Sequence, residues 1–120
     1  MLFRSLNCMY DTKLPDIFIL IHCVGTVLGK ASYSNYFVAC HNVTVGSDKG
    51  NSPTMLEGVY MGPGSSIIGN CKIGKFTHLT INSVVLDQDT DDESLIIGNS
   101  PNILSKNLKR NLIKEQYFKI

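Results

Sequence analysis

The chain has 120 residues, with 11 Lys or Arg against 10 Asp or Glu and a formal net charge of +1. This length allows one domain with a modest core, which excludes a large multi-part enzyme but leaves room for a site shared between subunits. The balanced charge offers no broad basic field for nucleic acid, and 43% hydrophobic against 18% charged residues excludes a disordered chain.

The most apolar stretch covers residues 17–28 and includes His22 and Cys23. It is much shorter than the roughly 20 residues of a membrane-spanning helix. No basic leader with a small-residue cleavage site precedes it. We therefore expect neither a signal peptide nor a membrane anchor, and no membrane among the partners.

The middle of the chain repeats every six residues, and this repeat predicts the fold. Eleven positions at this spacing are hydrophobic, with one slip of four residues at 51–54. They are Ile21, Val27, Tyr33, Ala39 and Val45 before the slip, and Met55, Met61, Ile67, Ile73, Leu79 and Val85 after it. Chance alone gives this result about three times in a thousand once six phases per segment are allowed.

Small residues accompany these hydrophobic positions. Four residues after successive positions come Ser65, Cys71, Thr77 and Ser83. Helical and plain two-residue periodicity both fail over 55–85, whereas flat coils of three short strands and about eighteen residues fit every position. The repeat predicts an all-β fold, a parallel β-helix of hexapeptide repeats with about four coils between residues 17 and 89.

One loop, residues 46–53, interrupts the repeat and contains Lys49. Its Gly, Asn, Ser and Pro are typical of a plain surface turn. Loops that interrupt solenoids also often carry function. Because it is the sole interruption of the repeat, we favour a functional loop.

An acidic run follows the repeat at residues 87–94. We expect it to be solvated, because it lacks the internal glycine that a calcium loop needs. The four cysteines, Cys8, Cys23, Cys40 and Cys71, form no CxxC pair. They predict reduced thiols in a cytoplasmic protein and no metal site.

The tail has leucines four residues apart, at Leu104, Leu108 and Leu112, and is rich in Lys and Arg. This spacing predicts an amphipathic helix over residues 103–118. We expect the helix to cap the open end of the solenoid, although its basic face also suits phosphates. The chain is thus divided into a β-helix domain, 1–102, and a helical tail, 103–120.

Three segments together resemble the serine acetyltransferase branch of the hexapeptide acyltransferases. They are residues 21–30 with His22, residues 42–46 with the sequence Asn-Val-Thr-Val-Gly, and residues 57–70. Gly98-Asn99-Ser100-Pro101 is similar to the family's terminal Gly-x-Pro element. The resemblance covers about residues 7–102. It implies a left-handed coil, a homotrimer with active sites between subunits, and acetyl-CoA as the donor.

The resemblance also implies that His22 is the catalytic base. A hydroxyl is a poor nucleophile at neutral pH, and an imidazole with a pKa near 6.5 can accept its proton during attack on a thioester. His41, nineteen residues later, is the rival at the same groove and a candidate for substrate binding. His78 lies on a distant coil, and each histidine can also be an ordinary polar residue hydrogen-bonded at a turn.

The sequence departs from the family pattern around this histidine. Asn7 stands where the family has the aspartate that orients the imidazole, with Asp11 or Asp16 as substitutes if the strand is shifted. Ile21 replaces the acidic residue that precedes the histidine. The 46–53 loop has neither Arg nor His, so Lys49 is its only basic candidate for a substrate carboxylate.

The resemblance assigns coenzyme contacts to five positions, namely Gly46, Pro63, Gly64, Ile81 and Asn82. Pro63 and Ile81 are eighteen residues apart, so we expect them to stack on successive coils. Pro63 has no N–H, and one backbone hydrogen bond to the pantetheine arm is therefore lost.

These features predict an acetyl-CoA-dependent O-acetyltransferase, similar to serine acetyltransferase, that acts on a hydroxyl of a small acceptor. Two alternatives stay open. The acceptor can be a sugar or nucleotide sugar of surface polysaccharide synthesis, or the chain can be a catalytically weak hexapeptide module for assembly. No nucleic acid is expected as a partner.

Overall fold

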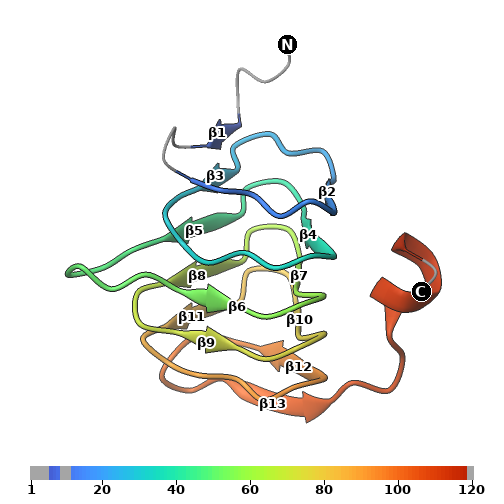
Figure 1. The fold of residues 1–120 in the computed structure, drawn as a ribbon. Coiled ribbons are helices and arrows are strands. Elements are labelled where there is room, and N and C mark those ends of the chain that lie inside the picture. Colours follow the sequence, from blue (N-terminus) through green and yellow to red (C-terminus); the bar gives the residue numbers. More distant parts are fainter. Residues whose placement is uncertain (1–5, 9–11, 119–120) are drawn as a thin grey trace.

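The computed structural model describes residues 6–8 and 12–118, which wind into a solenoid of about five turns (Figure 1). The turns form three faces, two of which carry a short strand from nearly every turn, whereas the third carries two strands. Face A contains β1 (Asn7–Cys8), β3 (Val27–Leu28), β5 (Thr44–Gly46), β8 (Ser66–Ile68) and β11 (Val84–Leu86). Face B contains β2 (Phe18–Leu20), β4 (Phe37–Ala39), β7 (Tyr60–Met61), β10 (His78–Leu79), β12 (Ser94–Ile97) and β13 (Leu104–Asn107). Face C contains β6 (Thr54–Met55) and β9 (Lys72–Ile73).

The predicted parallel β-helix is confirmed by the pairing between coils. Tyr60 pairs with His78 and Ser66 with Val84, in parallel ladders with partners eighteen residues apart. Across the 46–53 loop the separation widens, because Val45 pairs with Ile67. The loop thus bulges from one coil without shifting the strands on either side of it.

The interior follows the second part of the hexad repeat. All six predicted positions from Met55 to Val85 are buried in one core cluster. The small residues between them close the turns, because Ser65 and Thr77 donate their hydroxyls to carbonyls three residues earlier, at 2.6 and 2.8 Å. The large side chains therefore fill the interior of the solenoid, and the small ones form hydrogen bonds with backbone carbonyls at its turns.

The first part of the repeat was predicted wrongly at two positions. Tyr33, Ala39 and Val45 do contribute to the core, but Leu20 and Leu28 take the places expected for Ile21 and Val27. Leu20 lies opposite Ala39 and Leu28 opposite Val45, so the turn from β2 to β3 holds two more residues than the turn from β4 to β5. The inward positions are therefore offset by one residue from the predicted ones, and an offset of one residue exchanges the two faces of a strand.

The tail was also predicted wrongly, because residues 103–118 do not form one helix. Residues 104–107 form β13, which pairs antiparallel with β12 and covers the free edge at the end of the solenoid. Only a short π-helix, η2 (Ile113–Tyr117), follows. A strand caps the coil because it satisfies the edge hydrogen bonds that a helix cannot reach.

The helical segment lies instead against the outer side of face B (Figure 1). Phe118 packs on Tyr36 with ring centroids 5.1 Å apart, and Tyr117 lies 5.7 Å from Tyr60. Val38 and Ile113 are both buried, yet neither belongs to the interior core cluster. The tail thus builds a second, smaller apolar layer on this face.

The acidic run is more than a solvated surface. Asp87, Asp89 and Asp92 each accept a backbone N–H from the preceding coil, at 2.7–2.9 Å. Side-chain oxygens here replace the carbonyls of a strand, since no strand follows β9 on face C within the described residues. Within that same part of the chain, no helix is long and apolar enough to cross a membrane.

The revised inward positions give a direct test. We expect Leu28→Ala to lower the free energy of unfolding by about 2–5 kcal/mol, because it leaves a cavity in the core. Val27→Ala, one residue away and 37% exposed, is the matched control and should cost about 1 kcal/mol or less. Urea unfolding of both variants measures the difference. Equal losses would contradict the revised register.

Candidate functional site

The corner where face B turns into face A gathers most of the residues expected at the site. Here the chain leaves β2, β4, β7 and β10 in turn, and backbone hydrogen bonds connect successive turns. Gly64 donates its N–H to the His41 carbonyl at 3.0 Å, and Asn82 donates to the Pro63 carbonyl at 2.9 Å. We call this stack the B/A corner column, with Val24, His41, Pro63 and Ile81 at equivalent places.

His22 lies in the widened turn at the N-terminal end of this column. It is exposed and has a left-handed backbone, with φ +47°. Its carbonyl accepts the Val24 N–H at 2.6 Å, which closes the first half of the turn. His22 and His41 therefore occupy the same corner on neighbouring coils, whereas His78 lies in β10 within face B.

Asn7 lies in β1, next to the strand that follows the His22 turn. It is exposed, pairs with Val27, and donates its backbone N–H to the Thr26 carbonyl at 2.8 Å. Among the described residues, no hydrogen bond connects its side chain with His22. Asp16 precedes β2 and so lies across face B from His22, and Asp11 falls outside the described residues.

Gly46 and Lys49 lie apart from the column, at the opposite end of face A. Gly46 ends β5, and Lys49 sits in the tip of the loop, where Asp48 and Asn51 exchange two backbone hydrogen bonds of 2.9 Å. Ile21 is half-buried and donates its N–H to the Ala39 carbonyl at 2.8 Å. Within one chain, the structure therefore separates the loop from the histidines.

The backbone conformation and the packing at Gly64 require a glycine. Its φ is +74°, and a Cβ there would collide with the Asn82 side-chain oxygen of the next turn. Gly25 stands in the same relation to Asn42. A Cβ at Gly46, in contrast, would meet nothing within 4 Å. The B/A corner column is thus tightly packed, with backbone and side-chain amide groups of successive turns in contact. The 46–53 loop, in contrast, has open space next to Gly46.

The sequence analysis missed the apolar surface of this corner. Val24 and Ile81 are 64% and 68% exposed, which is unusual for aliphatic side chains. Beside Ile81 and Pro63 lies a hollow of about 400 Å³, which His78 and Tyr60 also line. Val24 belongs to the apolar stretch of residues 17–28, and Ile81 is expected to contact the coenzyme, but only the coil geometry shows that both side chains point outward.

His78 belongs to an aromatic cluster on face B. Its ring lies 4.2 Å from that of Tyr60, and the Tyr60 hydroxyl is 3.4 Å from the Cys40 sulfur. Burial lowers the pKa of His78. Burial, followed by the contact with Cys40, raises the pKa of Tyr60. Both rings therefore favour their neutral forms, and they pack against each other on face B.

Comparisons with known proteins agree with the fold. A serine acetyltransferase of Haemophilus influenzae is 37% identical over 71 residues, which cover 55% of this chain and 27% of that protein. A serine acetyltransferase of Buchnera aphidicola is 30% identical over 84 residues, covering 65% and 31%. The chain thus spans less than a third of the length of these curated relatives. No protein-family model matches it.

Solved structures extend the similarity to nearly the whole fold. A serine acetyltransferase in complex with cysteine matches with a TM-score of 0.79 and 25% identity, over 92% of this chain and 44% of that one. A serine acetyltransferase in complex with CoA matches with a TM-score of 0.65 and 29% identity, over 75% and 39%. The solenoid is therefore a left-handed parallel β-helix similar to that of the serine acetyltransferases.

Acid should destabilise the fold through His78. The pKa of His78 is lower in the folded state than in the unfolded state. As the pH falls below about 6.5, the unfolded chain therefore binds more protons than the folded chain. The free energy of unfolding should therefore decrease from pH 7 to pH 5. His78→Gln should reduce that decrease. Urea titrations of the wild type and the variant across this range measure it, and identical slopes in the two proteins would contradict the assignment.

Proposed function

We propose that the protein transfers the acetyl group of acetyl-CoA to a hydroxyl of a small acceptor. The observation that carries this proposal is the match of 92% of the chain to a serine acetyltransferase structure. A related structure holds CoA itself. The corner column, where a histidine and backbone amides lie on one ladder, supports a site for this reaction.

His22 is the proposed general base. Its neutral imidazole accepts the proton of the acceptor hydroxyl as the oxygen attacks the thioester carbonyl. The tetrahedral intermediate then collapses, the carbon–sulfur bond breaks, and the imidazolium protonates the leaving thiolate. The products are an acetyl ester and CoA. Exposure of His22 at the corner supports this role, because both substrates can reach it from solvent.

Asn7 is proposed to orient the imidazole through its amide oxygen. An amide can fix the tautomer, but it does not stabilise the imidazolium by charge as a carboxylate does. The proposed site therefore loses part of the electrostatic stabilisation available to the family pattern. The position of Asn7 next to the strand that follows the His22 turn is compatible with this role.

The coenzyme is proposed to lie along the B/A corner column, against Pro63, Gly64, Ile81 and Asn82. The Ile81 N–H has no backbone partner within the described part of the chain and is available to a pantetheine carbonyl. Pro63 offers no such donor one coil away. The exposed Ile81 side chain supplies apolar surface for the arm, and Gly46 is proposed to contact the coenzyme from a neighbouring subunit.

The acceptor is proposed to be a small hydroxyl compound, serine or a sugar. Ile21 cannot bind an ammonium group, and Lys49 is the only basic residue of the 46–53 loop. Both features weaken recognition of a free amino acid at the His22 corner. An amino or hydroxyl sugar, or a nucleotide sugar, avoids this difficulty because it needs no carboxylate clamp.

We also propose a homotrimer that works in the cytoplasm. Exposed aliphatic residues along face A and the corner column, including Val27, Leu86 and Ile81, support contact between subunits. A neighbouring subunit would bring Lys49 of its 46–53 loop to the His22 corner, where His41 is the candidate for substrate binding. The cysteines Cys8, Cys23, Cys40 and Cys71 are free thiols, which fits a reducing compartment.

Release of free thiol from acetyl-CoA tests the transfer reaction. We expect serine, homoserine or a nucleotide sugar to release CoA, and His22→Ala to reduce kcat by at least about 10²-fold with an unchanged unfolding midpoint. If His41→Ala is inactive and His22→Ala remains active, the base is His41 and the assignment to His22 is wrong. No release with any acceptor, together with no coenzyme binding by calorimetry, would favour the assembly module.

Light scattering tests the shared site. We expect the mass of three chains at micromolar concentration, because the groove that holds the coenzyme needs two subunits to complete it. Val27→Lys places a charge on an exposed apolar position of face A and should shift the mass towards the monomer. A wild-type chain that is monomeric would contradict the shared active site and leave the β-helix intact.

A further inference from the structure

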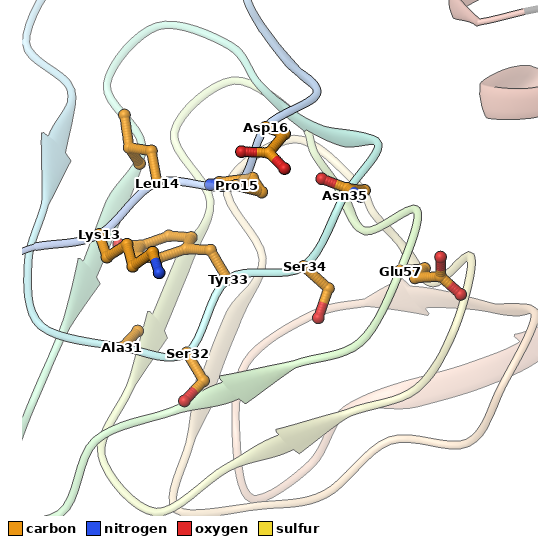
Figure 2. Close-up of a pocket in the computed structure, with 10 residues that line it drawn as sticks. All are labelled: Lys13, Leu14, Pro15, Asp16, Ala31, Ser32, Tyr33, Ser34, Asn35 and Glu57. Carbon is orange, nitrogen blue, oxygen red and sulfur yellow. The ribbon is translucent and has the colours of Figure 1, made fainter.

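A groove of about 580 Å³ opens on face C at the N-terminal end of the solenoid, between residues 13–16 and 31–35 (Figure 2). Ser32 bonds only towards the next coil, donating its N–H to the Pro53 carbonyl and accepting the Met55 N–H. The described backbone shows no hydrogen bond between Ser32 and the 13–16 segment. The groove therefore results from two coils that separate where the ladder is not formed.

The two coils are held together at one end of the groove. Asn35 accepts the Ile17 N–H through its side-chain oxygen at 3.1 Å, and Tyr36 donates its N–H to the Ile17 carbonyl at 2.7 Å. These bonds lie beside Asp16. They fix the distance between the two coils at this edge of the groove.

Apolar groups form much of the groove wall. Leu14, Pro15, Ala31 and the Tyr33 ring all line it (Figure 2). Tyr33 is fixed, because its hydroxyl donates to the Gly29 carbonyl at 2.7 Å and its ring packs edge-on against Phe37 at 5.3 Å. Burial raises the pKa of Tyr33, so the ring stays neutral. This wall suits an aliphatic group.

The charged residues of the groove have opposite signs and form no ion pair within the described part of the chain. Lys13, Asp16 and Glu57 line the groove, and the one ion pair among the described residues joins Arg110 and Glu115. Figure 2 shows Lys13 and Glu57 towards opposite ends, with Asp16 beside Asn35. Three residues of chain place the Lys13 and Asp16 backbones at most about 10 Å apart. One cation and two carboxylates thus surround an apolar surface.

We propose that this groove binds a zwitterionic amino acid with an apolar side chain. Asp16 pairs with the ligand ammonium, Lys13 with its carboxylate, and the aliphatic part lies against Pro15 and Tyr33. A phosphate ligand would meet two carboxylates, and a simple amine would leave Lys13 without a partner. Neutralising both ligand charges requires both signs on the protein, which the groove supplies.

This site is separate from the proposed transfer reaction. Asp16 precedes β2 and His22 follows it, so the groove and the B/A corner lie at opposite ends of one strand. Acetyl-CoA takes no part in the binding. Binding at this groove therefore goes beyond the proposed function and is tested by a separate measurement.

Three probes of matched shape test the inference in NMR titrations of the full chain. L-Leucine carries both charges, 4-methylpentanoate lacks the amine, and 3-methylbutylamine lacks the carboxylate. We expect saturable shifts at residues 13–16 and 31–35 with leucine, and affinity at least about tenfold weaker for each singly charged probe. No saturable shift with leucine, or equal affinity for either partial probe, would overturn the proposal.

Two variants and a control locate the charges. Asp16→Asn and Lys13→Gln should each weaken leucine binding by about tenfold or more, because each removes a charge-assisted hydrogen bond. Lys109→Gln removes the same charge at an exposed position of the C-terminal tail and should leave the affinity unchanged. Amide spectra confirm that each variant is folded. A loss with Lys109→Gln equal to that with Lys13→Gln would show a general charge effect and contradict the site.

Discussion

The ladder of hydrogen bonds between successive coils is the constraint on which the rest of the molecule depends. Every strand is only two to four residues long, so no strand is stable by itself. Parallel pairing at a separation near eighteen places each inward residue above an equivalent one, as Met61 lies beside Leu79. A continuous core results, although each coil alone would bury little apolar surface.

The same ladder explains where the candidate sites lie. At the B/A corner the ladder is complete, and it aligns His41, Pro63 and Ile81 at equivalent places with tight tolerances at Gly64. At the first coil the ladder opens on face C, and a groove lined by charges of both signs appears there. Regular pairing therefore builds the column proposed for the coenzyme, and its local absence creates the second candidate site.

The ends of the ladder need separate solutions, because each end exposes unpaired backbone groups. At the C-terminal end β13 reverses direction and pairs with β12. On face C, where no strand follows β9 in the described chain, carboxylates of the acidic run accept the N–H groups instead. Covering the edge in these ways leaves the short η2 helix to pack on face B.

The sequence by itself determined the repeat, the parallel β-helix and the inward positions from Met55 to Val85, because coil pairing imposes a period that composition alone cannot produce. It also indicated His22, Pro63 and Ile81 as candidates, and the structure gathers them at one corner. Their chemical roles stay predictions, since no hydrogen bond among the described residues joins His22 to Asn7.

Only the tertiary structure decided which residues of the first coil point inward, where the tail goes and how the acidic run is used. Two extra residues in the turn before Val27 shift the register, and no hexad pattern reveals a turn width. The tail carries a helical leucine spacing, but the open edge of β12 offers more hydrogen bonds to a strand. Such outcomes depend on unpaired groups that exist only once the coils have stacked.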